Sequence, residues 1–186
     1  GDQSDEKTRT VNVLGTSIVE VDGDIDVNTT WYADSIYLIT RIIDVDAVLT
    51  IQPGTVVKMK GSMEIRCKEG TIKAIGTSDT PIVFTSFRDD AHGGDTNGDG
   101  NLTAPAKGDW NYISLEGQNN QSEFTYCRFF YGGGHQSYDV TLKLESGNSQ
   151  VKNCTFAHNI GNESGALNAK EAENGTVITG NTFYDN

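Results

Sequence analysis

Cysteine, proline and cationic side chains are scarce in this chain, and long hydrophobic runs are missing. The 186 residues contain 3 cysteines and 3 prolines, and an odd number of cysteines does not indicate a disulfide framework. No apolar run approaches the roughly 20 residues that cross a bilayer, and no segment resembles a signal peptide, so we expect no membrane insertion. The sequence also lacks HExxH, GxSxG and CxxC patterns, and therefore gives no support to zinc chemistry or serine-triad hydrolysis.

The charge of the chain is strongly negative. Its 14 Lys and Arg residues against 26 Asp and Glu residues give a formal net charge of −12. Such a field repels nucleic acid and anionic membrane surfaces and attracts cations. The 21 glycines suit many tight turns, and the few prolines leave strand ladders uninterrupted. We therefore expect one elongated domain with affinity for cations and none for nucleic acid.

One structural unit is repeated three times between Trp110 and Asn186. Phe129, Phe156 and Phe183 are each 27 residues apart. Three further apolar columns share this register: Ile113/Val140/Leu167, Leu115/Leu142/Ala169 and Phe124/Val151/Ile178. Between the columns apolar and polar residues alternate, which is the period of half-buried strands. Short strands that repeat in this way predict a single-stranded parallel β-helix of about five coils.

The other segments are assigned by their place relative to these coils. Residues 1–10 are polar and are expected to be a disordered or linker segment, whereas 11–186 form the β-helix domain. Residues 11–31 are the candidate N-terminal cap, and 88–109 are a long inserted loop. Because Asn186 directly follows a strand, the last coil has no cover, and we expect either further coils beyond it or end-to-end self-association.

Turn positions follow the same 27-residue spacing. Asn153 lies between the second and third strands of a coil, where a positive φ is needed. Asn159 and Asn186 close the third strand of successive coils, and stacked asparagines can hydrogen-bond along the axis. Cys127 and Cys154 are expected to stack inside adjacent coils, where the strand spacing favours buried thiols over a disulfide.

Several phrases of the chain resemble a known family. NTTWYADSIYLI, VLTIQPGTVVKM, GTIKAIGTSDTPIVFTS and GDWNYISL are similar to the opening of right-handed parallel β-helix proteins that bacteria secrete or display on their surface. VKNCTFAHN and ITGNTFYDN resemble the repeat of pectin-lyase-like proteins. The resemblance implies a right-handed helix and a secreted, cell-surface or periplasmic location. It implies no particular reaction, because the family has no single catalytic motif.

The inserted loop contains part of a calcium-binding pattern. Positions one, three, five and six of D-x-[DN]-x-[DN]-G are filled by Asp95, Asn97, Asp99 and Gly100, and Asn101 at the next position would contribute its carbonyl. Oxygen ligands at alternate positions can wrap one hard cation, and the glycine at position six permits the sharp turn. Ala106 stands at position twelve in place of the bidentate glutamate, so Asp89, Asp90 or Asp109 is needed to complete the site. We predict a structural Ca²⁺ ion; the alternative is a solvated acidic loop.

Aromatic residues near the two loops suggest a second kind of site. The candidate ligand-binding residues for stacking on sugar rings are Trp110, Tyr112, Tyr131, His135 and Tyr138. Each of them alone is better explained as a core or turn residue. The set nevertheless favours a polysaccharide as the ligand, because an extended ridged surface suits an extended polymer.

Outward-facing rows provide the remaining candidates. With Ile113 and Leu115 inward, the expected outward rows are Ser114/Thr141/Asn168 and Glu116/Lys143/Lys170. Lys143 or Lys170 could act as the base of a lyase, but no carboxylate cluster accompanies them in this register. The sequence therefore predicts no catalytic residue and favours a non-catalytic structural or glycan-binding module. A polysaccharide lyase or glycosidase and an adhesin stalk remain the alternatives.

Overall fold

The computed structural model describes residues 10–13, 16–118, 120–135, 140–145, 147–161, 165–173 and 175–186, and these form strands, turns and loops. Sheet A contains β1 (Thr10–Val13), β2 (Thr16–Val21), β4 (Ser35–Ile39), β7 (Val56–Met59), β10 (Ile82–Ser86), β13 (Cys127–Phe130), β16 (Thr155–Ala157) and β19 (Thr182–Tyr184). Sheet B contains β5 (Ile43–Val45), β8 (Ile65–Cys67), β11 (Ile113–Leu115), β14 (Leu142–Leu144) and β17 (Leu167–Asn168). Sheet C contains β3 (Thr29–Trp31), β6 (Val48–Ile51), β9 (Thr71–Ile75), β12 (Glu123–Thr125), β15 (Gln150–Lys152) and β18 (Val177–Thr179).

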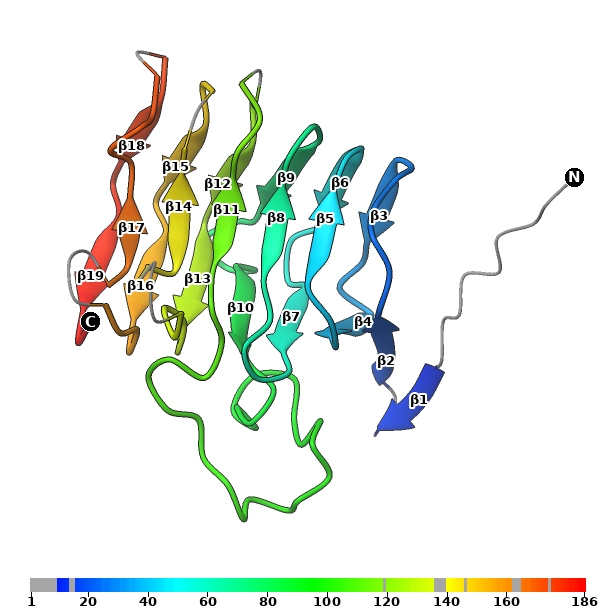
Figure 1. Cartoon of the computed structure of the whole chain (residues 1–186). Coiled ribbons are helices and arrows are strands. Elements are labelled where there is room, and N and C mark those ends of the chain that lie inside the picture. The colour runs from blue at the N-terminus through cyan, green and yellow to red at the C-terminus, as the bar shows by residue number, and fades with distance from the viewer. Residues whose placement is uncertain are drawn as a thin grey trace, which may run out of the picture.

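The chain winds through the three sheets in a fixed order. It passes from sheet B to sheet C to sheet A and then begins the next coil, and each strand from β2 onward pairs in parallel with its counterpart one coil away (Figure 1). This is a right-handed parallel β-helix: the repeat predicted the parallel β-helix, and the family resemblance implied its right hand. Sheet C contributes six described strands, one more than the five coils expected. None of the described residues forms a helix able to cross a membrane.

The phenylalanine column is the clearest repeat inside the helix. Phe129 stacks on Phe156 with ring centroids 4.7 Å apart and planes 7° from parallel, and Phe156 stacks on Phe183 at 5.1 Å and 9°. Phe84 extends the stack toward the N-terminus at 5.0 Å from Phe129. Phe124, Val151 and Ile178 are also paired in register, as the spacing predicted.

The predicted register of sheet B is wrong by two residues at β14, whereas the predicted alignment of Ile113 with Leu167 is correct. Ile113 pairs with Leu142 rather than Val140, and Leu142 pairs with Leu167. The outward row is therefore Ser114, Lys143 and Asn168. The error arises because the turns on both sides of β14, from sheet A and to sheet C, differ in length from those of the neighbouring coils. The turns between sheets C and A in the last three coils keep the 27-residue spacing.

Asparagine side chains link the coils at the end of sheet A. The fully buried Asn159 accepts a hydrogen bond at Oδ1 from the Gly132 amide (2.8 Å) and donates from Nδ2 to the Phe129 carbonyl (3.1 Å). Asn186 repeats this pattern one coil later, on the Asn159 amide (3.2 Å) and the Phe156 carbonyl (2.9 Å). The amide ladder predicted from the spacing is present because each asparagine satisfies two buried backbone groups of its neighbour.

A second ladder lies at the turn between sheets C and A, and in it a cysteine sulfur takes the place of one asparagine side chain. Asn181 accepts from the Cys154 amide (2.8 Å) and donates to the Val151 carbonyl (2.9 Å). One coil earlier, Cys154 Sγ accepts from the Cys127 amide (3.4 Å) and donates to the Phe124 carbonyl (3.4 Å). Both thiols are buried and free, as the strand spacing predicted.

The candidate cap and the last coil differ from the coils between them. Within residues 11–31, β1 pairs antiparallel with β2, whereas β2 and β3 are already parallel to the next coil and Ile25 bridges to Val45. Most of this segment therefore follows the path of a coil, and only β1 departs from it. At the opposite end the side chain of Phe183 is 48% exposed, whereas that of Phe156 is fully buried.

Candidate functional site

The inserted loop is the largest excursion from the coils, between β10 and β11 (Figure 1). A buried lysine of sheet A holds its first half. Lys58 Nζ donates to the Asp89 carbonyl (2.9 Å), the Gly94 carbonyl (2.7 Å) and Thr96 Oγ1 (3.0 Å). Burial lowers the pKa of Lys58 to about 8, although the nearby aspartates act in the opposite direction. At neutral pH the ammonium group therefore remains charged and fixes the loop on the outer face of sheet A.

Asp89 is the second anchor. Its Oδ2 accepts from Thr85 Oγ1 (2.6 Å) and lies 2.7 Å from His92 Nδ1, and its Oδ1 accepts from the Ala91 amide (3.2 Å). Burial acts to raise the pKa of Asp89, but the hydrogen bonds of His92 and Thr85 outweigh it and hold the pKa below its usual range. With its oxygens already engaged, Asp89 is part of the loop's attachment rather than a free cation ligand.

The return of the loop is fixed by Asp109. Its carboxylate accepts from Ser86 Oγ (2.7 Å), from Arg88 (3.2 Å) and from the Ala106 amide (3.1 Å). Lys107 beside it forms an ion pair with Asp185 of the last coil (2.9 Å). Both ends of the loop are thus fastened to the helix, and the segment between them carries the remaining acidic side chains.

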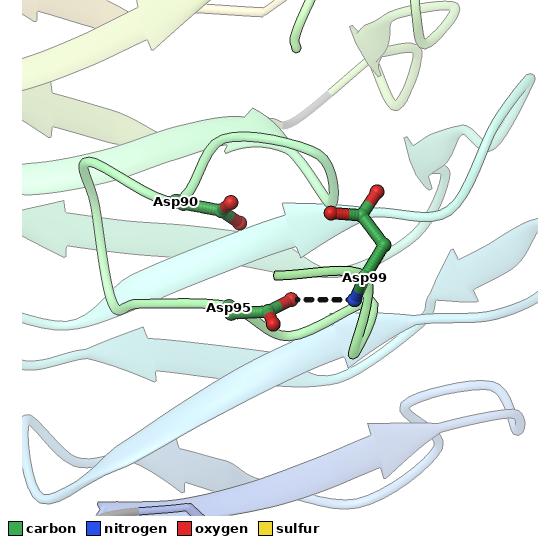
Figure 2. Close-up of side chains that lie close together, drawn as sticks. All are labelled: Asp90, Asp95 and Asp99. Atoms are coloured by element: carbon green, nitrogen blue, oxygen red, sulfur yellow. Dashed lines mark hydrogen bonds between the residues drawn. The ribbon is translucent and has the colours of Figure 1, made fainter. Parts of the chain in front are cut away.

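Three of these side chains converge. Asp90, Asp95 and Asp99 each place a carboxylate oxygen within 4.8 Å of the others (Figure 2). Asp95 is oriented by the amides of Gly98 (2.7 Å), Asp99 (3.1 Å) and Gly100 (2.8 Å). Backbone donors of this kind fix a carboxylate without neutralising it, so the cluster is pre-arranged and strongly negative.

Asp90 is the member of the cluster whose charged form is least favoured. Its Oδ1 is buried and has no hydrogen-bond partner among the described residues. Burial and then the charge of Asp95 raise the pKa of Asp90. In contrast, the hydrogen bonds of Thr103 hold the pKa of Asp99 below its usual range. An unpaired carboxylate oxygen facing two further carboxylates fits the donor set of a hard divalent cation.

The other predicted metal ligands have different surroundings. Asn97 donates from Nδ2 to Asp99 Oδ2 (2.8 Å) and accepts at Oδ1 from the Asp99 amide (3.3 Å), next to the cluster. Asn101 has a positive φ of 71° and an exposed side chain. Asp109 lies outside the three-carboxylate cluster. The residues that would hold Ca²⁺ are therefore Asp90, Asp95 and Asp99, with carbonyl or amide oxygens of the loop beside them.

Among the described residues, the predicted aromatic side chains do not form one exposed surface. Trp110 is fully buried and donates from Nε1 to the Phe130 carbonyl (2.7 Å), so it is a core residue. Tyr131 stacks on His158 with planes 15° apart, which covers a face of its ring. Tyr112 is 7% exposed and contacts His135 edge to face at 5.6 Å. Tyr138 lies outside the described residues.

Sheet B carries a polar outer face that the corrected register defines. One row across the sheet is Asp44, Arg66, Ser114, Lys143 and Asn168. Asp44 accepts from Arg66 (2.9 Å) and Lys68 (2.8 Å), and Ser114 donates to Glu116 (2.5 Å). Lys143 pairs with Glu145.

Sequence reasoning missed two buried charged side chains, Glu64 and Lys58. Glu64 is 5% exposed, accepts from Asn111 Nδ2 (2.8 Å) and interacts with Tyr112, whose pKa is raised by burial and then by Glu64. Lys58 is the other. The only sequence signal for Lys58 was a lysine inside the apolar run VVKM, next to a strand followed by acidic residues. Neither partner set could be found without the fold, because the partners are 31 to 48 residues away.

A right-handed parallel β-helix that carries one long, anchored acidic loop is the class of protein that these observations define. The family model of a pectate-lyase-like beta helix domain matches residues 23–141, and the chain belongs to this family. The searches match the chain to no curated protein and to no solved structure.

Proposed function

We propose that this domain is a non-catalytic extracellular module, structural or glycan-binding, whose 88–109 loop is ordered by Ca²⁺. The observation that carries the proposal is the convergence of Asp90, Asp95 and Asp99 within 4.8 Å. A bound divalent ion offsets the repulsion of three carboxylates and occupies the side of Asp90 that has no hydrogen bond among the described residues. When bound, the ion cross-links the loop, and the three aspartates fix the position of the ion.

The calcium part is tested by titrating the protein with Ca²⁺ by calorimetry. Asp95→Asn and Asp99→Asn are expected to weaken binding by on the order of tenfold each, because each change removes a negative charge in direct contact with the ion. Asp79→Asn is the matched control, since Asp79 is an exposed turn residue outside the loop. Equal affinity in all three variants contradicts the site.

The glycan part is supported by the outer face of sheet B. This face is polar and carries Arg66 and Lys143 in one row on either side of Ser114. Since strands of a sheet lie about 4.8 Å apart, the two cationic side chains are spaced along the helix axis, the direction in which an extended polymer would run. Because Arg66 is paired with Asp44 and Lys143 with Glu145, the row carries little net charge, and its hydrogen-bonding groups suit the hydroxyl groups of a polysaccharide.

The test is retention of acidic and neutral polysaccharides on immobilised protein, with Ca²⁺ and with chelator, while new chain ends are followed. Retention that falls in Arg66→Gln and persists in the exposed control Lys60→Gln supports glycan binding. New chain ends would instead support a lyase or glycosidase on the same face, the alternative that the Arg66 and Lys143 row favours. If neither retention nor new chain ends are observed, the result supports the adhesin stalk instead.

A further inference from the structure

The tip of the acidic loop contains an asparagine followed by glycine. Asn97 is partly exposed, and Gly98 is exposed with a φ of 72°. A side chain at Gly98 would meet no heavy atom within 4 Å, so the space beside the Gly98 Cα is open. A glycine that follows an asparagine has no side chain to shield its own backbone nitrogen from the asparagine side chain. These are the conditions under which an asparagine side chain can react with its own backbone.

We infer that Asn97 is a site of spontaneous deamidation that introduces a further carboxylate beside the Asp95 and Asp99 pair. In the first step the Gly98 nitrogen attacks Asn97 Cγ, a new N–C bond closes a five-membered succinimide, and the Nδ2 group leaves as ammonia. In the second step water opens the ring at either carbonyl and leaves aspartate or isoaspartate. No oxidant or cofactor enters the balance, since water is the only co-reactant.

The hydrogen bonds of the loop are arranged to assist the first step. Asp95 Oδ1 accepts from the attacking Gly98 amide at 2.7 Å, where a carboxylate can take up the proton that this nitrogen must lose. The Asp99 amide donates to Asn97 Oδ1 at 3.3 Å, the oxygen on which negative charge develops. Nucleophile, base and oxyanion donor therefore come from five consecutive residues held in one turn.

The leaving group has its own contacts. Asn97 Nδ2 donates to Asp99 Oδ2 (2.8 Å) and to Thr103 Oγ1 (3.0 Å). After hydrolysis, an aspartate at this position would place a carboxylate against that of Asp99. The consequence for the cation rests on the proposed function: position three of the calcium pattern would then carry a charged ligand, and the affinity for a divalent ion would rise.

The test is incubation of the purified chain in calcium-free buffer at mildly alkaline pH, followed by digestion and mass spectrometry of the peptides. Conversion of an amide to an acid is expected to accumulate at Asn97 and to remain undetectable at Asn101, which lies in the same loop but precedes leucine. Asn97→Gln should abolish the change in that peptide, because its longer side chain does not close the same ring. An Asn97 that stays unmodified as long as Asn101 does overturns the inference.

Two variants separate the parts of the argument. Asp95→Asn should slow conversion at Asn97, whereas Asp79→Asn should not, and equal rates overturn the role assigned to Asp95. Asn97→Asp, titrated with Tb³⁺, is expected to bind more tightly than the unmodified chain, and unchanged affinity overturns the link to the cation. Since deamidation is read by mass without any metal, failure of the calcium site would leave that result standing.

Discussion

Truncation of Asn159 tests whether the amide ladder stabilises the helix. In Asn159→Ala the Gly132 amide and the Phe129 carbonyl, both buried, lose their side-chain partner. A buried polar group left without a hydrogen bond costs roughly 1–3 kcal/mol, so two such groups predict a loss of about 4 kcal/mol in the free energy of unfolding. Asn186 also loses the Asn159 Nδ2 donor at 2.8 Å. A loss of this size is a large fraction of the stability of a single domain.

The assay is urea unfolding at equilibrium, followed by circular dichroism. Asn153→Gly is the matched control, because Asn153 is exposed and has a φ of 52°, a conformation that glycine adopts without strain. This control is expected to change stability by less than about 0.5 kcal/mol. If Asn159→Ala unfolds at the same urea concentration as the control, the ladder contributes no stability and the reasoning is refuted.

Three further predictions concern the buried groups. Because burial lowers the pKa of Lys58 from 10.5 to about 8, the unfolded chain binds more protons between these values, and the free energy of unfolding should rise with pH there. The rise should be about 3 kcal/mol and be missing in Lys58→Met, as unfolding at several pH values would show. Gly132→Ala places a carbon 2.7 Å from Thr141 Cγ2 and 2.8 Å from Trp110, and should cost about 2 kcal/mol in unfolding experiments, with Gly23→Ala as the neutral control. The three buried cysteines should react with a thiol reagent only after urea unfolding. If the folded protein is labelled as fast as a free small-molecule thiol, their burial is contradicted.

The fold was predictable because its repeat is written directly in the chain. Phe129, Phe156 and Phe183 share one spacing and stack in the structure, since a stacked coil must present the same side chain to its neighbour. The register of sheet B was not predictable from this spacing. Ile113 pairs with Leu142 because the connecting turns vary in length, and a turn of different length leaves no trace in the periodicity of the strands.

The candidate sites were predictable only in part. Asp95 and Asp99 are close in sequence, so the calcium pattern revealed them, and Asp90 was one of three aspartates that could complete the site. The aromatic surface failed as a prediction for Trp110, because composition cannot tell a tryptophan exposed on a sheet from one that fills the core. Whether the loop binds Ca²⁺ stays a prediction.

The sequence by itself determined the stacked coils, the asparagine ladder and the place of the inserted loop, because each of these depends on spacing along the chain. The tertiary structure alone decided how the loop is attached. Lys58 reaches the Asp89 and Gly94 carbonyls from another strand of sheet A, and Lys107 reaches Asp185 in the last coil. Such contacts join residues that are distant in sequence and close only after the coils have stacked, so no local pattern encodes them.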